Sequence, residues 1–388
     1  MPSNLKKAMK VTSKSKSTSY PIEISADCLS SVGRFAKSAV GGGLAAVTIV
    51  SNKKVFRLYG AEVVGSLKKA GLRAEVILIG DGERHKNMRT AEKILKFLSE
   101  KKMTRTDAVV ALGGGVVGDV AGFASALHLR GIACIQIPTT LVAMIDSSVG
   151  GKTGVNSADG KNLVGVFHRP AGVLIDVSTL STLESRELTA GFCEAVKHGL
   201  LSGKALLTAT TEFLDRFPVH AFGSNTRNAR FKKELVKLVC AQIEFKRSVV
   251  IQDENEDPAR SDSKSRKILN LGHTLAHSIE RVAGFGRIRH GEAVGIGIVF
   301  AAEVSVRAGL LKPADMEHVL NSIASVGCLP SIKRLNGSAL LEAFTSDKKN
   351  LAGSLQLVLL KGIGKPVITD ARRIGRKTLV KALETITI

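Results

Sequence analysis

Histidines and carboxylates gather in two stretches of the chain where they could hold a metal ion. His273 and His277 lie four positions apart in HTLAH, and His290 follows in the same glycine-rich run. GFCEAVKHG (191–199) contributes Glu194 from a separate helical pattern. One carboxylate and two imidazoles with an open position form the ligand set of a catalytic zinc. These residues therefore predict a divalent-metal site, and spacing alone favours His273 and His277 as one ligand pair.

Other interpretations of the same residues stay open at this level. Glu194, Lys197 and His198 share one helical face, which would carry an ion pair if the face were solvated. Apolar neighbours instead favour a buried face, where a carboxylate needs a compensating partner. Any single histidine is also compatible with a packed, hydrogen-bonded core position. HTLAH lacks the glutamate after its first histidine that marks a metalloprotease helix.

A glycine-rich turn predicts a second chemical site. VVALGGGVVGDVAGFASA (109–126) places Gly113, Gly115 and Gly118 as GxGxxG between a strand-like run and a helical one. Glycines let backbone N–H groups approach a pyrophosphate, and the helix start adds positive potential. A tight strand-to-helix turn is the alternative. The turn follows the third or fourth strand, and no acid about twenty positions on matches the usual ribose ligand, so we predict a dinucleotide site of unusual layout.

Two further loops carry anion-binding groups. PTTLVAMIDSSVGGKTGVN (138–156) holds hydroxyls, glycines, Asp146 and Lys152, and GKNLVG adds Lys161 and Asn162. A solvated turn is the alternative for any one lysine. Two lysines on glycine-rich loops at the carboxyl side of a parallel sheet favour a phosphate-bearing ligand.

The elements that must position these groups fall into two halves. From Tyr20 to about Asp176, continuous β-branched runs alternate with helical patterns, as in a buried parallel sheet built from βαβ units. The predicted strands are 45–50, 74–80, 107–112, 133–138 and 172–176, and the predicted helices include 54–70, 90–101 and 116–127. Beyond Asp176 the pattern is helical, at 178–203 with hydroxyl N-cap residues, 231–247, 269–283, 291–308 and 314–326, with one strand-like run at 355–360.

The predicted fold class is α/β plus all-α, with an N-terminal Rossmann-like parallel-sheet domain followed by a mainly helical metal-binding domain. We place a disordered basic tail at 1–19, the nucleotide-binding α/β domain at 20–180, and the helical metal- and substrate-binding domain at 181–388.

Composition narrows the class of partner. The 388 residues carry a net charge of +22, and residues 1–19 supply five lysines and no acid. Such a charge suggests a polyanion, but with no tryptophan and two tyrosines for base stacking we expect anionic small molecules and not nucleic acid. Five scattered cysteines without CxxC spacing predict reduced thiols in a cytoplasm. We expect neither a membrane span nor a signal peptide, because no apolar run has the required length or place.

Taken together, these motifs resemble those of the 3-dehydroquinate synthase family of sugar-phosphate cyclases, from Tyr20 onward. The matching stretches are DGERHK (81–86), ALGGGVVGDVAGF, IPTTLVAMIDSSVGGKTGVN, GKNLVG, GFCEAVKHG, RKILNLGHTLAHSIE (266–280), HGEAVGIG and DKKNLAG (347–353). The resemblance implies an NAD cofactor, a zinc or cobalt ion and a homodimer. It implies conversion of 3-deoxy-D-arabino-heptulosonate 7-phosphate into 3-dehydroquinate and phosphate, a shikimate-pathway step toward chorismate and the aromatic amino acids. That reaction proceeds by transient NAD oxidation, phosphate elimination, re-reduction and intramolecular aldol closure.

The resemblance also implies roles for individual residues. The metal ligands are Glu194, His273 and His290, which leaves His277 facing the substrate. The residues for NAD are Asp81, Glu83, Lys86, Gly114, Gly115, Val116, Val117, Gly118, Asp119, Thr139, Thr140, Lys161, Thr179, Leu180, Ser181 and Thr182. Those for the substrate are Arg130, Asp146, Lys152, Lys161, Asn162, Lys197, Lys246, Arg266, Asn270 and His277. Catalytic roles among them fall to Lys152, Lys197, Arg266, Asn270 and His277.

Four positions depart from the family pattern. They are Ala276 where glycine is usual, His128 where an aromatic is common, Asn52 where an aspartate often meets the cofactor ribose, and Gln356 about where some members place a substrate lysine.

Related activities remain as alternatives. An aminodehydroquinate or 2-deoxy-scyllo-inosose synthase would share the chemistry, and a metal-dependent polyol dehydrogenase would accumulate NADH. A nucleic-acid-binding protein without turnover is the alternative of another class. The residues that favour the dehydroquinate assignment are Arg130, Asn162, Arg266, Asn270 and His277.

Overall fold

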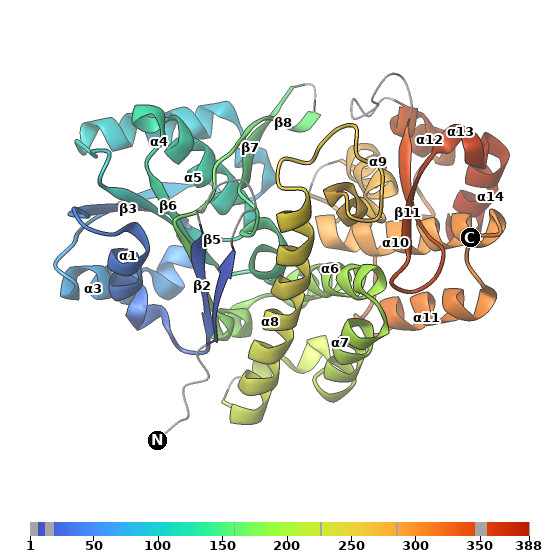
Figure 1. Ribbon diagram of the computed structural model, residues 1–388, viewed down its shortest axis with the longest axis horizontal. Coiled ribbons are helices and arrows are strands. Elements are labelled where there is room, and N and C mark those ends of the chain that lie inside the picture. The colour runs from blue at the N-terminus through green and yellow to red at the C-terminus, as the bar shows by residue number, and fades with distance from the viewer. Residues whose placement is uncertain are drawn as a thin grey trace. The chain divides into compact units, whose positions relative to one another are not determined.

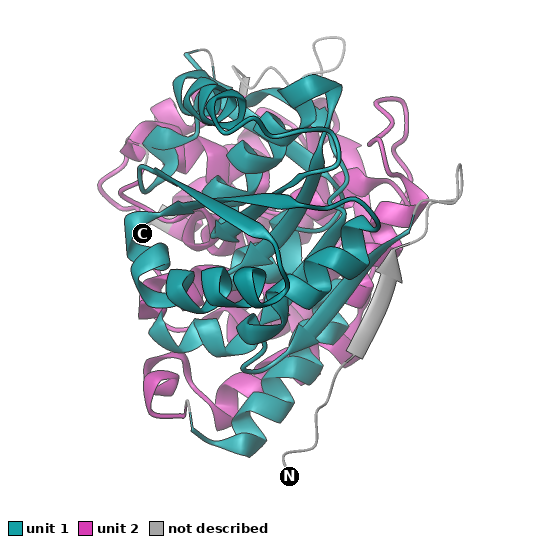
Figure 2. Ribbon diagram, turned by 90° about the vertical axis from the view of Figure 1, so that its left-hand side faces the viewer, with its two compact units in different colours: residues 1–182, 226–243 teal, residues 183–225, 244–388 magenta. Residues whose placement is uncertain are grey.

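The computed structural model describes residues 7–11, 19–158, 160–225, 227–284, 286–345 and 355–387 (Figure 1). The chain divides into two compact units, coloured separately in Figure 2: unit 1 holds residues 1–182 and 226–243, and unit 2 holds residues 183–225 and 244–388. The motif DKKNLAG and most of the basic tail lie outside the described residues. Across the described ranges, no helix has the length and apolar character needed to cross a membrane.

Unit 1 is built around a sheet that has seven strands among the described residues, in the order β1-β2-β9-β6-β5-β3-β4. The strands are β1 Lys7–Val11, β2 Tyr20–Ser25, β3 Ala46–Asn52, β4 Arg73–Ile79, β5 Ala108–Gly113, β6 Ala133–Pro138 and β9 Gly172–Asp176. All neighbouring pairs from β2 to β4 are parallel. β3, β5 and β9 are buried along their whole length, as apolar strands covered on both faces must be. The predicted parallel α/β sheet is confirmed.

Helices cover both faces of this sheet. The helices of unit 1 before the crossover to unit 2 are α1 Val32–Val40, α2 Lys53–Val55, α3 Ala61–Lys69, α4 Met88–Glu100 and α5 Gly115–Leu127. Val47 and Ile49 of β3 pack in the layer of α1 and α3, whereas Ala46 and Val50 pack in the layer of α4 and α5. Because the strands are parallel, their carboxyl ends share one edge, and the loops that follow β4, β5, β6 and β9 all start there.

Two parts of unit 1 differ from the sequence prediction. Residues 7–11 were expected in a disordered tail, but they form β1 and pair antiparallel with β2, whose backbone groups would otherwise be an open sheet edge. Residues 152–167 were expected as loops, but they form an antiparallel hairpin of β7 Lys152–Ser157 and β8 Gly160–Phe167. Its glycines hid the strand pattern. A Cβ at Gly154 would lie 2.7 Å from the Val164 carbonyl oxygen, so the close strand pairing requires glycine there.

Unit 2 is mainly helical, as predicted. Its helices are α6 Ser185–Ser202, α7 Lys204–Arg216, the end of α8 Ala229–Gln252, α9 His273–Ala283, α10 His290–Arg307, α11 Pro313–Ala324, α12 Gly337–Thr345, α13 Ala371–Ile374 and α14 Arg376–Thr387. β10 Gln356–Leu360 and β11 Pro366–Asp370 pair antiparallel, so the predicted strand-like run has a partner that sequence reasoning missed. The hydroxyl residues expected to cap α6 instead lie in a separate 3-10 turn, Val177–Thr182, and the N-cap is Glu184.

Glycines bring the helices of unit 2 into backbone contact. A Cβ at Gly291 on α10 would lie 2.0 Å from the Ala190 carbonyl oxygen of α6, and a Cβ at Gly297 would lie 2.0 Å from the Gly272 carbonyl oxygen before α9. Gly272 has φ +80°, which also favours glycine. The start of α9 and the first turns of α10 therefore approach more closely than two helices can when larger side chains lie between them.

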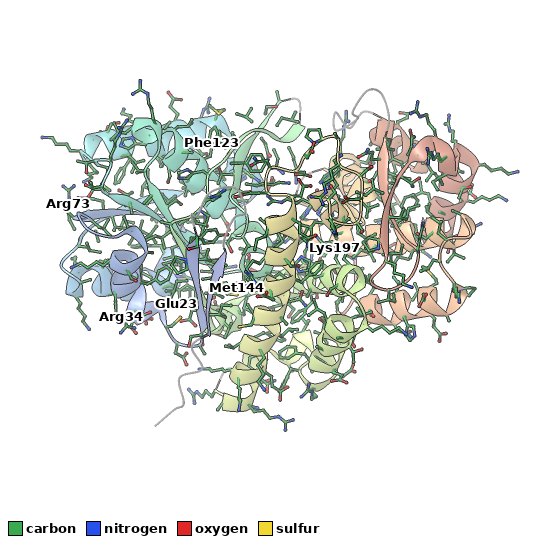
Figure 3. The ribbon with its side chains drawn as sticks, in the orientation of Figure 1. Glu23, Arg34, Arg73, Phe123, Met144 and Lys197 are labelled. Carbon is green, nitrogen blue, oxygen red and sulfur yellow. The ribbon has the colours of Figure 1, made fainter. Side chains whose placement is uncertain are left out.

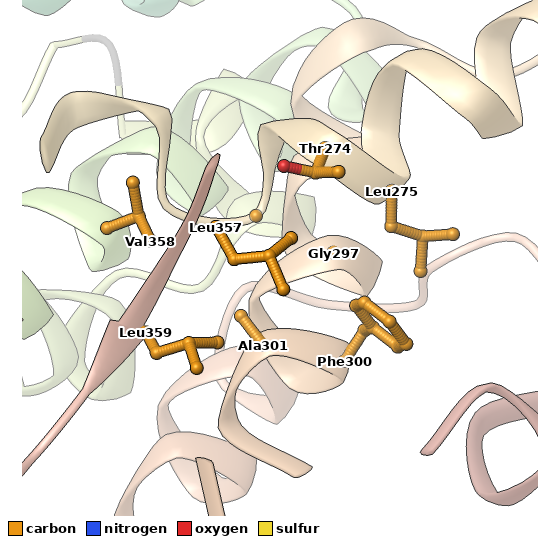
Figure 4. A pocket seen from close by; sticks show the side chains of 9 residues that line it. Thr274, Leu275, Gly297, Phe300, Ala301, Leu357, Val358 and Leu359 are labelled. Atoms are coloured by element: carbon orange, nitrogen blue, oxygen red, sulfur yellow. The ribbon is translucent and has the colours of Figure 1, made fainter. Parts of the chain in front are cut away.

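A small apolar cavity lies beside this contact, between α9, α10 and β10 (Figure 4). Leu275, Phe300, Leu357 and Leu359 are among the side chains that line it. The cavity volume is about 10 Å³, which is close to the minimum needed for one water molecule. A cavity of this size and lining is a packing defect, too small for any ligand larger than a water molecule.

The glycine contact makes a prediction for stability. Gly297→Ala should lower the free energy of unfolding by about 1–3 kcal/mol, because the added methyl group meets a backbone oxygen that cannot rotate away. Gly65→Ala on α3 is the matched control: a Cβ there meets nothing within 4 Å. It should raise the free energy of unfolding by about 0.5–1 kcal/mol through helix propensity. Denaturant melts of both variants measure the difference, and equal stabilities would contradict the packing described.

Candidate functional site

Three side chains from three helices of unit 2 converge on one point. Glu194 lies in the middle of α6, whereas His273 begins α9 and His290 begins α10. One potential ligand atom from each lies within 4.8 Å of the other two. Glu194 Oε1 is 3.9 Å from His273 Nε2 and 3.8 Å from His290 Nε2. These separations are too long for hydrogen bonds and suit atoms that would share one ion at about 2.0–2.2 Å.

The outer nitrogen of each ring has a hydrogen-bond acceptor. His273 Nδ1 donates to the Leu271 carbonyl oxygen at 3.2 Å, and His290 Nδ1 donates to Glu280 Oε2 at 3.2 Å. In a neutral imidazole this leaves the Nε2 lone pair pointing toward Glu194. Such outer hydrogen bonds orient metal-binding histidines.

The Glu194 carboxylate is buried, and one of its oxygens has no compensating positive charge or hydrogen bond among the described residues. Glu194 is fully buried, and no hydrogen bond from a described residue reaches Oε1. Oε2 lies 2.5 Å from Nζ of Lys197, which is 1% exposed and labelled in Figure 3. Oε1 and two imidazole lone pairs facing one another would repel, and a cation among them removes the repulsion. The donor set therefore fits a divalent metal of the zinc type.

The pKa of His273 agrees with a role as a neutral ligand. Burial lowers this pKa well below its usual range, and the charges of Lys197, His290 and His277 act in the same direction. The ring thus stays unprotonated near neutral pH, which keeps Nε2 free to bind a metal.

The other histidines of these motifs lie beside the three-residue group. The ring centroid of His277 is 5.8 Å from that of His273 and 6.1 Å from that of His290. The group of potential ligand atoms within 4.8 Å of one another holds His273 and His290 but not His277, so the i, i+4 pair is not the pair that faces Glu194. His198 is buried and packs against Phe245 at 5.2 Å.

Three cationic side chains that the sequence assigned to the substrate are buried in unit 2. Lys197, Lys246 and Arg266 are 1%, 6% and 3% exposed. Arg266 begins a 3-10 turn, Arg266–Asn270, and its Nη1 donates to the Glu254 carbonyl oxygen at 2.8 Å. Asn270 ends this turn and is half-buried. Lys197 has an anionic partner within unit 2, because its Nζ lies 2.5 Å from Glu194 Oε2.

An ion pair joins the two helices that carry Glu194 and His290. Arg186 in the first turn of α6 donates to both oxygens of Glu292 in the first turn of α10, at 2.8 and 2.7 Å. Glu292 Oε2 also accepts the backbone N–H of Arg289 at 2.8 Å, which fixes the residue before His290. The bidentate pair therefore positions the start of α10.

In unit 1, one polar network gathers residues from four predicted motifs. Lys86 Nζ contacts the Asp119 carboxylate of α5 and donates to Asn162 Oδ1 of β8 at 2.5 Å. Glu83 Oε1 accepts from Asn156 Nδ2 at 2.8 Å and lies 3.7 Å from Lys161 Nζ. The stretch after β4, the start of α5 and the β7–β8 hairpin are thus linked by charge and hydrogen bonds.

The glycine-rich turn leads directly into α5. β5 ends at Gly113, Gly114 is the N-cap, and the helix begins at Gly115. A Cβ at Gly114 would lie 3.0 Å from Thr140 Cγ2, and one at Gly118 would lie 2.7 Å from Gln136 Oε1. Small residues here let the helix start approach β6 and its following loop. Val116 and Val117 lie in the first turn, whose N–H groups are the ones available to a phosphate.

The loops after β6 and β9 hold the remaining residues that the resemblance assigns to the cofactor. Thr139 N donates to the Gly113 carbonyl oxygen at 3.0 Å, which ties that loop to the glycine turn. Thr179, Leu180, Ser181 and Thr182 form the 3-10 turn after β9. Tyr59 donates its hydroxyl proton to the Thr179 carbonyl oxygen at 3.0 Å and lies 2.5 Å from Thr182 Oγ1.

The resemblance assigns three more residues of unit 1 to the substrate, Arg130, Asp146 and Lys152. Arg130 is exposed, with φ +66° beside Gly131, a strained conformation of the kind found at functional sites. Asp146 lies in a π-helical turn, Ala143–Ser147, and Lys152 begins β7 with an exposed side chain.

The departures from the family pattern have local explanations. Asn52 ends β3, caps α2 by accepting from Val55 N at 2.8 Å, and donates to Asp81 Oδ1 at 3.0 Å. His128 is buried and hydrogen-bonded to the Met103 carbonyl oxygen at 3.1 Å. Gln356 Oε1 accepts from Lys267 Nζ at 3.2 Å. Ala276 is fully buried in α9.

Sequence reasoning missed several residues that support the site. The ones with direct contacts are Tyr59, Asn156, Arg186, Glu280 and Glu292. Glu280 carried a weak signal, because it lies seven positions after His273 and so on the same face of a helix. The others act on residues far along the chain and gave no local pattern.

Comparison with known proteins identifies close similarity along most of the chain. Residues 76–190 match the model of the 3-dehydroquinate synthase N-terminal region, and residues 191–350 match that of its C-terminal region. A 3-dehydroquinate synthase of Pelobacter propionicus is 41% identical over 355 residues, 91% of this chain and 93% of that protein.

Solved structures are also similar. A 2-deoxy-scyllo-inosose synthase in complex with carbaglucose-6-phosphate, NAD+ and Co2+ aligns with TM-score 0.80 at 27% identity, covering 98% of this chain and 99% of that one. A 2-epi-5-epi-valiolone synthase from Streptomyces hygroscopicus subsp. jinggangensis, with NAD+ and Zn2+ bound, aligns with TM-score 0.79 at 26% identity, covering 96% and 99%.

The geometry predicts which histidine variants lose the metal and which retain it. His273→Ala and His290→Ala should each weaken zinc binding by more than ~100-fold, because a direct ligand contributes more than the outer hydrogen bonds whose loss costs ~10–100-fold. His277→Ala should retain zinc. Elemental analysis after dialysis measures the content, with exposed His318→Ala on α11 as control. Loss of zinc from His277→Ala, with zinc retained in His290→Ala, would contradict the ligand set.

Proposed function

The chain belongs to the 3-dehydroquinate synthase family, and from this we propose that it converts 3-deoxy-D-arabino-heptulosonate 7-phosphate into 3-dehydroquinate and inorganic phosphate. The observation that carries the proposal most directly is the group formed by Glu194, His273 and His290, because an unassisted alcohol is hard to oxidise. The 41% identity with a synthase over most of both chains supports the substrate assignment.

We assign the divalent metal, zinc or cobalt, to Glu194, His273 and His290. When bound, such an ion lowers the pKa of a coordinated substrate hydroxyl. The protein's own contribution is to hold the three donors in place through Leu271, Glu280 and the pair of Lys197 with Glu194. Related cyclases bind NAD+ together with Co2+ or Zn2+, which supports both cofactors here.

We assign NAD to unit 1. The first turn of α5 would face the pyrophosphate, and the residues that complete the site are Asp81, Glu83, Lys86, Asp119, Thr139, Thr140, Lys161 and the turn Thr179–Thr182. When bound, NAD accepts a hydride and returns it within one catalytic cycle. The Lys86–Asp119 pair holds the glycine turn against the stretch after β4, so it orients the backbone donors.

The substrate carries a phosphate and a carboxylate, and the chain supplies cations in both units. Lys197, Lys246 and Arg266 in unit 2 are buried, so their charges act in a low dielectric. We assign Arg130, Lys152 and Lys161 of unit 1 to the same substrate, as the family resemblance implies. Planar Arg groups suit a carboxylate or phosphate in bidentate contact.

His277 and Asn270 are the assigned groups for proton handling and orientation. His277 lies one turn past His273, beside the metal ligands but outside their group. Its imidazole can donate to a leaving phosphate or relay a proton from a neighbouring carbon. Asn270 offers an amide that can fix a hydroxyl or carboxylate of the substrate.

The alternative function with support from an observation is that of a different sugar-phosphate cyclase. A 2-deoxy-scyllo-inosose synthase aligns over 98% of this chain. The 41% identity with a 3-dehydroquinate synthase over 91% of this chain instead favours the heptulosonate phosphate. The two substrates can be compared directly in one assay.

We also propose that the chain forms a homodimer through β8. Four large apolar side chains of this strand are exposed: Leu163 (44%), Val164 (36%), Val166 (37%) and Phe167 (51%). Within the described residues β8 pairs only with β7, which leaves its other backbone edge open to a second strand. Exposed apolar side chains on both faces of a strand with an open edge are typical of a contact between copies.

The activity assay follows phosphate release from the heptulosonate phosphate in the presence of zinc and catalytic NAD. Phosphate should be released over many turnovers per NAD without an increase in NADH absorbance, because the hydride is returned in each cycle. His277→Ala should lose ~10²–10⁴ in rate, the usual range for acid–base assistance. Net NADH formation would point to a dehydrogenase, and turnover of glucose 6-phosphate alone would point to the other cyclase.

The dimer prediction is tested by light scattering after size exclusion. The unmodified chain should elute as a dimer, and Phe167→Glu should shift it to a monomer because a charge would be buried in the contact. Leu58→Glu changes an exposed leucine outside β8 and should leave the dimer intact. A monomeric unmodified chain would exclude the proposed contact.

A further inference from the structure

We propose that Glu280 is a positioning residue of the metal centre, where its carboxylate fixes the ring of His290 so that Nε2 faces the ion. This inference rests on the proposed function, because it assumes that Glu194, His273 and His290 hold a metal. Glu280 does not bind the metal itself, but it raises the affinity of the site for the metal by a measurable factor.

The placement of Glu280 follows from the geometry of α9. It lies seven residues after His273, about two helical turns, and therefore on the same side of the helix. From there Oε2 accepts the Nδ1 proton of His290 at 3.2 Å. One helix thus provides a ligand at its first residue and the orienting group for another ligand two turns later.

The burial of the two partners shows which one is fixed. The Glu280 side chain is 4% exposed, whereas that of His290 is 39% exposed. A partly exposed imidazole has other accessible ring orientations, and choosing one costs conformational entropy when the metal binds. A hydrogen bond to a buried, immobile carboxylate restricts the ring before binding, which raises affinity.

The two histidines differ in the kind of acceptor they use. His273 Nδ1 donates to a backbone carbonyl oxygen, that of Leu271, whereas His290 Nδ1 donates to a carboxylate. A charged acceptor makes a stronger hydrogen bond and increases the electron density at Nε2. Glu280 therefore supports His290 by orientation and by charge, and a substitution can remove the charge while keeping the shape.

The test is a cobalt titration of the metal-free protein, followed by its visible absorption bands. Glu280→Gln should still bind one Co2+, with a Kd raised ~10–100-fold, the usual cost of losing such an outer group. Glu303→Gln is the matched control on α10, thirteen residues beyond His290 and ~20 Å along the axis, and should bind like the unmodified chain.

Glu280→Asp retains the charge but withdraws the carboxylate by one carbon, and replaces Glu280→Gln if that variant is not recovered folded. It should also weaken Co2+ binding, because the bond to Nδ1 lengthens beyond hydrogen-bonding distance. Circular dichroism of each metal-free variant checks the fold.

Equal affinities and spectra for Glu280→Gln and the unmodified chain would overturn the role of Glu280 and leave the proposed function in place. Failure of the unmodified chain to bind Co2+ would instead overturn the proposed metal site, and this inference with it.

Discussion

The organisation of unit 2 depends on one buried carboxylate. Glu194 lies at the centre of α6 without access to solvent, and its Oε1 faces the Nε2 atoms of two imidazoles. Negative charge and lone pairs in a low-dielectric interior are unfavourable unless a cation accompanies them. Lys197 supplies one positive charge at Oε2, and a divalent ion is the natural complement at Oε1. Glycines let α6, α9 and α10 approach closely enough for the three side chains to converge.

Unit 1 brings its polar groups together through backbone donors and a network of polar side chains. A parallel sheet places successive loops at one edge, so residues distant in sequence meet without long connections. Lys86 shows the result, because it contacts Asp119 of the glycine-turn helix and Asn162 of the hairpin. The net charge of +22 is of the sign that suits the proposed substrate, which has two anionic groups.

Sequence reasoning predicted what is local and missed what tertiary packing creates. The strands of the parallel sheet were predictable because buried strands are continuous apolar runs, as β5 shows. The β7–β8 hairpin was not, since its glycines resemble loop composition while serving close strand pairing. Periodicity favoured His273 with His277, but the group that converges combines His273 with residues of two other helices, and helix packing cannot be read from spacing. Family resemblance named that group, but neither route assigned a role to Glu280, Arg186 or Glu292.

The central claim is that one carboxylate and two imidazoles, and not three imidazoles, bind the metal. X-ray absorption at the zinc edge of the loaded protein tests it most directly, because multiple scattering from imidazole rings counts the histidines. The account predicts two imidazole nitrogens and at least one carboxylate oxygen at about 2.0–2.2 Å, with the remaining position filled by water. A spectrum that requires three imidazoles would place His277 among the ligands and contradict the division of roles between His277 and Glu194.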